Sequence, residues 1–147
     1  SEICIRDRTP INEDYSINKA LFLNHCKNIL KQGLDGLTLF GTNGEASSFS
    51  IKQKKETIQF LLENRIDPKI LMPGSGSSSL EDAIEMTKFC AAIGTKAVLV
   101  LPPYYFKNVS DEGVITYYRN VIEACGDNSF HFLLYKDRCL PIHNYNY

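Results

Sequence analysis

Residues 36–45 (Gly-Leu-Thr-Leu-Phe-Gly-Thr-Asn-Gly-Glu) join an apolar run to a polar turn that contains two glycines. The run at 36–40 is nearly all apolar, which is typical of a strand buried on both faces of a parallel sheet. The glycines free the backbone for a tight turn, and Thr42 and Asn43 carry short side chains that donate and accept hydrogen bonds. Such a turn suits a carboxylate or another small anion, although a plain polar turn is also consistent with it.

Further apolar runs of the same kind follow along the chain. Helical patterns, with apolar residues at three-to-four spacing, precede and separate the runs. Ser50 and Gln53 fit a capping box at the start of one helix. The additional predicted strands cover residues 69–72, 97–101 and 130–135, and the predicted helices cover residues 16–32, 51–65, 80–93 and 111–125.

The regular alternation of helices and strands predicts an α/β fold. Two architectures fit it, an open doubly wound sheet and a closed (β/α)8 barrel. A barrel takes roughly 200 residues or more, so on length alone the 147 residues of this chain favour the open sheet. Residues 2–6 are a further candidate strand, whereas residues 136–147 show no periodicity and are expected to form an irregular tail.

Composition excludes several classes of protein. The 16 Lys+Arg and 17 Asp+Glu give a net charge of −1 without a basic stripe, so a nucleic-acid partner is not expected. No apolar run is long enough to cross a membrane. The five cysteines are widely spaced without a CxxC pair, which indicates no zinc site and favours a reducing compartment, the cytoplasm. Neither a metal nor a cofactor is expected.

Aromatic residues stand where two of the predicted strands end. Residues 102–105 (Pro-Pro-Tyr-Tyr) follow one strand, and Tyr135 closes another. Ligand sites of α/β folds lie at the carboxyl ends of the strands, where a phenol can relay a proton or bind a substrate oxygen. The alternative is that these aromatics pack against loops or another subunit. Residues 73–79 lack the spacing of a phosphate loop and are expected to be a connecting loop with a serine N-cap.

Taken in order, these motifs resemble the dihydrodipicolinate synthase/N-acetylneuraminate lyase family. The resemblance covers residues 9–135, and Asn43 with the Pro-Pro pair favours members that act as 2-keto-3-deoxy sugar acid aldolases. The matching segments are Thr9-Pro10, Gly41-Thr42-Asn43-Gly44-Glu45, Pro73-Gly74-Ser75-Gly76, Pro103-Tyr104-Tyr105 and Leu134-Tyr135.

The resemblance implies a (β/α)8 TIM barrel, usually assembled as a homotetramer, and it overrides the length argument for an open sheet. The chain would then be an incomplete barrel that holds about the first five βα steps. Residues 1–135 would form this partial aldolase domain, and residues 136–147 would be foreign to the family pattern.

The resemblance also implies a chemistry. Family members are pyruvate-dependent class I aldolases or lyases, in which a lysine on strand six forms a Schiff base with a 2-oxo acid. Carried over to this sequence, the catalytic proton relay falls on Thr42, Tyr135 and, reaching in from a neighbouring subunit, Tyr105. The substrate-binding role, which holds the pyruvate carboxylate, falls on Asn43.

No lysine of this sequence matches the strand-six lysine. Lys136 follows Tyr135 at once and is not its equivalent. The sequence therefore predicts a truncated Schiff-base lyase or aldolase. The alternative is a catalytically inactive fragment that associates with full-length subunits or with a second fragment, or that binds small carboxylates.

Overall fold

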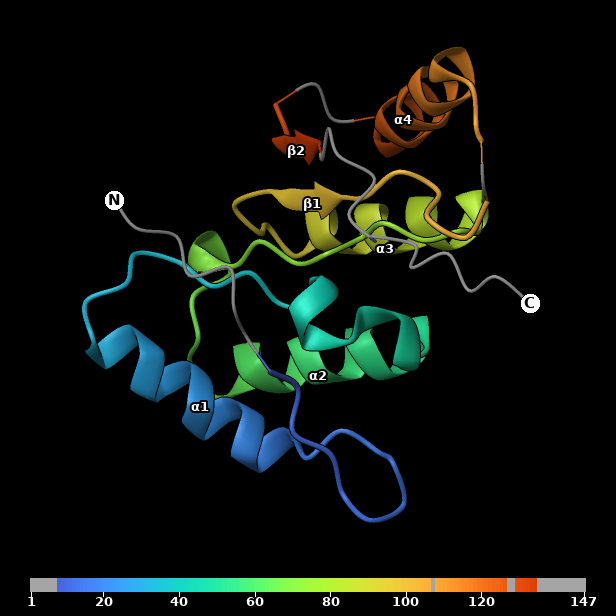
Figure 1. The fold of residues 1–147 in the computed structure, drawn as a ribbon. Helices are drawn as coiled ribbons and strands as arrows, with labels where there is room; N and C mark the ends of the chain where they lie inside the picture. Colours follow the sequence, from blue (N-terminus) through green and yellow to red (C-terminus); the bar gives the residue numbers. More distant parts are fainter. Residues whose placement is uncertain (1–7, 107, 127–128, 135–147) are drawn as a thin grey trace.

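The computed structural model describes residues 8–106, 108–126 and 129–134 (Figure 1). The candidate strand at 2–6, Tyr135 and the expected tail at 136–147 lie outside the described residues. The elements, in order, are α1 (Lys19–Lys31), η1 (Thr42–Gly44), η2 (Ala46–Ser48), α2 (Ile51–Glu63), η3 (Pro68–Ile70), α3 (Leu80–Ala92), β1 (Val98–Val100), α4 (Asp111–Cys125) and β2 (Phe132–Leu134).

The helices follow the sequence pattern closely, and their caps explain where they begin and end. The capping box of α2 is confirmed, since Ser50 accepts from the N–H of Gln53 and the Gln53 side chain accepts from the N–H of Ser50. Helix α1 begins three residues later than predicted because Asn18 caps it, accepting from the N–H of Leu21 at 3.0 Å. Gly126 ends α4 in the left-handed conformation that favours glycine, with φ 70°.

The strands are shorter than predicted. Single parallel bridges replace the full strands predicted at 36–40 and 69–72. Leu37 bridges to Leu71, and Gly74, two residues after the second run, bridges to Leu99. Two prolines, Pro68 and Pro73, have no N–H to donate, and the first of them opens the short helix η3, so the predicted strand at 69–72 is cut to a bridge.

Four parallel segments nevertheless lie next to one another in the order of the chain. The Gly74 N–H donates to Leu39 O at 2.7 Å, and the Leu99 N–H donates to Pro73 O at 2.9 Å. The third segment, β1, pairs in parallel with β2, Val98 opposite Phe132. Each helix packs against the next, α1 on α2, α2 on α3 and α3 on α4 (Figure 1). A sequential order with no reversal fits a singly wound barrel and does not fit the doubly wound sheet that length alone favoured.

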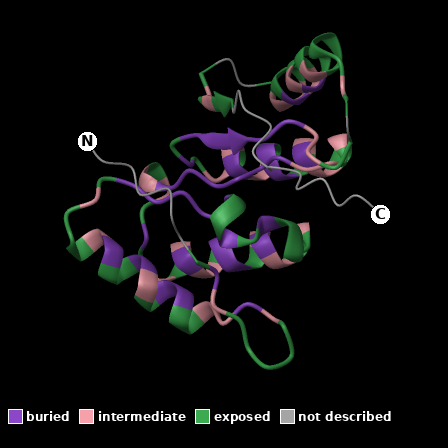
Figure 2. Ribbon diagram, in the orientation of Figure 1, coloured by how far each residue is buried: buried purple, intermediate pink, exposed green. Residues whose placement is uncertain are grey.

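The core runs along the inner faces of the helices and the middle segments, and Figure 2 shows β1 buried and β2 largely exposed. The ring of Phe40 lies between those of Phe22 and Phe49, with centroids 5.8 and 6.4 Å away. Cys26 and Cys90 are also buried here, as expected of thiols that act as small hydrophobes. Burial raises the pKa of the Cys90 thiol to about 12, against a smaller opposing effect of its hydrogen bond with Thr95.

One charged side chain, Lys54 of α2, is only 6% exposed. Burial lowers the pKa of its ammonium below the ordinary 10.5, and the carboxylate of Asp82 on α3 partly opposes that shift. In the described part of the chain, no helix is long and apolar enough to cross a membrane.

Candidate functional site

The turn at residues 41–45 is built from short 3-10 turns. The Gly44 N–H donates to Gly41 O at 3.0 Å, and Glu45 then takes a left-handed backbone, φ 54°, which separates η1 from η2. A buried hydrogen bond from the Thr9 hydroxyl to Gly44 O, 2.9 Å long, ties the Thr-Pro segment to this turn. The backbone is therefore held from both sides, while the side chains of Thr42 and Asn43 remain exposed.

A cavity of about 230 Å³ lies beside the turn. In its lining, the Ser47 hydroxyl donates to the phenol oxygen of Tyr104 at 3.0 Å, a contact between segments 57 positions apart in the sequence. This bond joins the turn to the aromatic loop that follows β1. The cavity is lined by Thr42, Glu45, Ala46, Ser47, Ser48, Gly76, Leu101, Pro102 and Tyr104.

The loop at 73–79 contributes Gly76 to the lining of the smaller cavity and is held along its length. The Ser75 N–H donates to Leu99 O at 2.9 Å. The Tyr117 hydroxyl of α4 donates to Ser77 O at 2.6 Å and accepts from the Ser77 N–H at 3.2 Å. Burial raises the pKa of Tyr117, so its phenol stays neutral and able to donate. Ser79 caps α3 as predicted, accepting from the Asp82 N–H at 3.3 Å.

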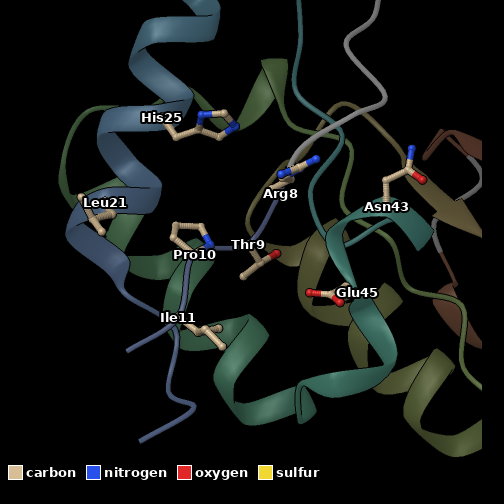
Figure 3. A pocket seen from close by; sticks show the side chains of 8 residues that line it. All are labelled: Arg8, Thr9, Pro10, Ile11, Leu21, His25, Asn43 and Glu45. Carbon is tan, nitrogen blue, oxygen red and sulfur yellow. The ribbon is translucent and has the colours of Figure 1, made fainter. Parts of the chain in front are cut away.

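A second cavity, of about 720 Å³, lies on the other side of the turn, between it and α1 (Figure 3). The segment that begins at Arg8 runs between α1 and the turn, and Leu21 and His25 come from α1. Glu45 lines both cavities, and its carboxylate points toward the larger one (Figure 3). The cavity is lined by Arg8, Thr9, Pro10, Ile11, Leu21, His25, Asn43 and Glu45.

The residues assigned from the sequence lie in different places. Thr42 lines the smaller cavity and Asn43 the larger one. Tyr105 is 77% exposed, lines neither cavity, and stacks edge-on against Phe106 with centroids 5.6 Å apart. Tyr135 lies outside the described residues. Among the described residues the structure therefore brings Thr42 and Asn43 to adjacent cavities, and their roles remain predictions.

Sequence reasoning missed Tyr104 and Ser47, which line the smaller cavity and are joined by a hydrogen bond. The Pro-Pro-Tyr-Tyr motif pointed at the aromatic pair, but the resemblance selected its second member, Tyr105. No signal in the sequence marked Ser47. Within the ranges that the structure describes, no group of three or more His, Cys, Asp or Glu side chains is arranged to hold a metal ion.

Several known proteins resemble this chain in sequence and in fold. The profile of the Dihydrodipicolinate synthetase family matches residues 3–136. A 4-hydroxy-tetrahydrodipicolinate synthase of Bartonella bacilliformis is 33% identical over 79% of this chain and 39% of its own length. The crystal structure of dihydrodipicolinate synthase from Agrobacterium tumefaciens superposes with a TM-score of 0.85 at 28% identity, over 90% of this chain and 46% of that one.

A 2-keto-3-deoxygluconate aldolase variant of Sulfolobus solfataricus, solved as a pyruvate complex, is also similar. It has a TM-score of 0.78 at 26% identity, over 92% of this chain and 44% of its own. The chain thus spans about two fifths of the Bartonella synthase, and it has the α/β fold of these barrel proteins over the part that it covers. The profile match over most of its residues shows that the chain belongs to the dihydrodipicolinate synthetase family.

Proposed function

We propose that this chain contributes the turn at 41–45 to the site of a pyruvate-dependent lyase or aldolase that works through a Schiff base. The observation that carries the proposal is the position of Thr42, which lines a cavity together with the hydrogen-bonded pair Ser47 and Tyr104. Family membership supports it, as does the pyruvate bound by the similar Sulfolobus enzyme.

The proposed chemistry uses groups that this turn offers. An uncharged lysine amine adds to the ketone carbon of a 2-oxo acid, and protonation of the resulting hydroxyl with loss of water leaves a protonated imine. Removal of a proton from the neighbouring carbon then gives an enamine, which attacks an aldehyde. The Thr42 hydroxyl would move protons in these steps, together with Tyr105 and Tyr135, while the Asn43 carboxamide would donate to the substrate carboxylate.

The lysine that the resemblance implies lies on the strand after Tyr135 and has no counterpart in this sequence, since Lys136 directly adjoins Tyr135. Residues 1–135 would thus bind the 2-oxo acid without bonding to it covalently, and residues 136–147 would take no part. Relatives include both synthases and 2-keto-3-deoxygluconate aldolases. Asn43 favours the 2-keto-3-deoxy sugar acid aldolases over the synthases.

The proposed assembly is a homo-oligomer, and the proposed location is the cytoplasm. Tyr105 and Phe106 are 77% and 55% exposed, a pair of aromatic rings that a neighbouring subunit would cover in a homo-oligomer. That contact would carry Tyr105 to the neighbour's cavity. Cys26, Cys90 and Cys125 form no disulfide bond with one another, in keeping with work in the cytoplasm.

The test measures pyruvate binding to the 147-residue chain by titration calorimetry and by saturation-transfer NMR. Thr42→Val removes the hydroxyl and keeps the shape, so we expect binding to weaken about two- to tenfold, the effect of one neutral hydrogen bond. Thr116→Val, at an exposed position of α4, is the matched control and should bind as the unaltered chain does.

Two results would contradict the proposal. One is that pyruvate does not bind at millimolar concentration, or that Thr42→Val and Thr116→Val behave alike. The other comes from borohydride reduction in the presence of pyruvate, followed by mass spectrometry. We expect no adduct on this chain alone, and an adduct on any of its lysines would show that it carries its own nucleophile.

A further inference from the structure

The hydroxyl of Tyr117, on helix α4, satisfies two backbone groups of a single residue in the loop at 73–79. It donates to Ser77 O at 2.6 Å and accepts from the Ser77 N–H at 3.2 Å. Tyr117 is 7% exposed and shares the buried side of α4 with Val121, one turn further along the helix. A side chain forty positions away in the sequence therefore fixes the peptide groups of Ser77.

The surroundings of Tyr117 keep its phenol neutral. Burial raises the pKa of Tyr117, and the hydrogen bond with Ser77 only partly opposes that rise. The negative charges of Tyr104 and Asp82 raise the pKa further, so both groups lie within electrostatic reach of the phenol. A neutral phenol can donate and accept at the same time, as both bonds to Ser77 require.

Gly76 connects this anchored residue to the smaller cavity. It directly precedes Ser77 and lines the cavity together with Leu101. A Cβ atom on Gly76 would overlap the backbone nitrogen of Leu101 and lie 2.8 Å from the Leu101 Cβ. Gly76 therefore lies directly against Leu101, and any displacement of Ser77 would disturb that contact.

The segment after Leu101 leads from this contact to the phenol in the cavity lining. The prolines at 102 and 103 fix their φ angles, which makes the connection to Tyr104 stiff. The Tyr104 oxygen in turn accepts from the Ser47 hydroxyl at 3.0 Å. One contiguous set of contacts thus runs from α4 to the lining of the smaller cavity.

The same loop has a second anchor that acts on a different residue. The Ser75 hydroxyl accepts from the hydroxyl of Thr87 on α3 at 3.0 Å, and both side chains are buried. The backbone of Ser75 is held separately, because its N–H donates to Leu99 O at 2.9 Å. Loss of the Thr87 hydroxyl would therefore remove a buried hydrogen bond and leave the path of the loop backbone in place.

We propose that Tyr117 is a positioning residue for the smaller cavity: it holds Ser77 and thereby keeps the loop against the segment that carries Tyr104. It acts through the contact of Gly76 with Leu101 and does not itself line the cavity. The inference rests on the proposed function for the identity of the ligand, pyruvate. The position of the loop is measurable without a ligand.

Tyr117→Phe keeps the ring and removes the hydroxyl, so Ser77 loses both hydrogen bonds. We expect the dissociation constant for pyruvate, measured by titration calorimetry, to rise about three- to tenfold. Hydrogen exchange at the Ser77 amide, followed by NMR, should become at least about tenfold faster. Thr87→Val is the matched control, since it also lowers the urea midpoint by deleting a buried hydrogen bond to this loop. It should leave the affinity for pyruvate within about twofold.

The unaltered chain gives a further measurement that needs no variant, because its Ser77 amide should exchange slowly. A Ser77 amide that exchanges like a free peptide would overturn the proposal, as would unchanged exchange in Tyr117→Phe. If pyruvate binds, an unchanged affinity in Tyr117→Phe, or an equal loss in Thr87→Val, would also overturn it. If the unaltered chain binds no pyruvate, the proposed function is wrong, and the exchange of Ser77 in Tyr117→Phe alone decides whether Tyr117 positions the loop.

Discussion

Gly74 stands where two neighbouring segments of the sheet come closest, and replacing it with alanine tests the account of the fold. A Cβ atom at this position would overlap the carbonyl oxygen of Phe40 and lie 3.0 Å from its carbonyl carbon, whereas ordinary contacts begin at 3.4 Å. Both obstructing atoms belong to backbone and cannot rotate away. Gly74 does not have a positive φ. Glycine is therefore required here because there is no room for a Cβ atom, and not because of the backbone conformation.

The expected cost of Gly74→Ala follows from the contacts that must give way. Moving the segments apart stretches the bond from the Gly74 N–H to Leu39 O, 2.7 Å long. Overpacking costs about 1–3 kcal/mol and a lost hydrogen bond about 1 kcal/mol, so we expect roughly 2–4 kcal/mol less stability. For a chain of this size that is a fall in Tm of roughly 5–15 °C.

Thermal and urea unfolding, followed by far-UV circular dichroism, measure this difference. Gly41→Ala is the matched control, because the nearest atom to its added Cβ, Thr38 Cγ2, is 3.9 Å away and its φ of −79° suits alanine. We expect Gly41→Ala to be neutral or to stabilise by about 0.5 kcal/mol. A Gly74→Ala protein that melts with the unaltered chain, or a Gly41→Ala protein as unstable as Gly74→Ala, would refute the reasoning.

Three further predictions concern a buried charge, a cap and a thiol. Because burial lowers the pKa of Lys54, the unfolded chain keeps more of this amine protonated than the folded chain does as pH approaches 10.5. The contribution of Lys54 to stability should therefore increase over that range, against the opposite effect of the raised pKa values of Cys90 and Tyr117. In urea titrations Lys54→Met should lack that increase; the same increase in the variant would contradict it. Ser50→Ala should cost about 1 kcal/mol and Ser50→Asp should restore most of it, and equal stability of all three proteins would rule out the cap. Iodoacetamide at pH 8 should leave Cys90 unmodified, as mapped by mass spectrometry, while the partly exposed Cys125 reacts; early labelling of Cys90 would disprove its burial.

Local chemistry explains which parts of the fold the sequence predicted well. The helix at 111–125 begins and ends as expected, because Ser110 before it and Gly126 after it are unambiguous caps. The predicted strand at 69–72 is longer than the bridge that the structure shows, because Pro68 and Pro73 lack an N–H for a ladder. Whether a missing N–H interrupts a ladder depends on the neighbouring segment whose carbonyl would accept it. That neighbour is about thirty residues away in the chain, so local periodicity cannot identify it.

The site was predictable in its position but not in its detail. Residues 41–45 stand at the end of an apolar run, and the structure places Thr42 beside a cavity there. Which tyrosine of the adjacent pair turns inward depends on the path of the loop after β1, and only the structure distinguishes Tyr104 from Tyr105. That Asn43 borders a different cavity from Thr42 follows from the 3-10 turn that they share, which motif spacing does not describe.

The sequential order of the four segments has a consequence for how the chain folds. Each segment pairs with the one made just before it, and each helix packs on its predecessor. Contacts between successive units span about thirty residues, so loop closure costs little and no unit waits for a distant part of the chain. During synthesis, each new unit can dock on the preceding one as it leaves the ribosome. Among the described segments, β2 would then be the last to dock.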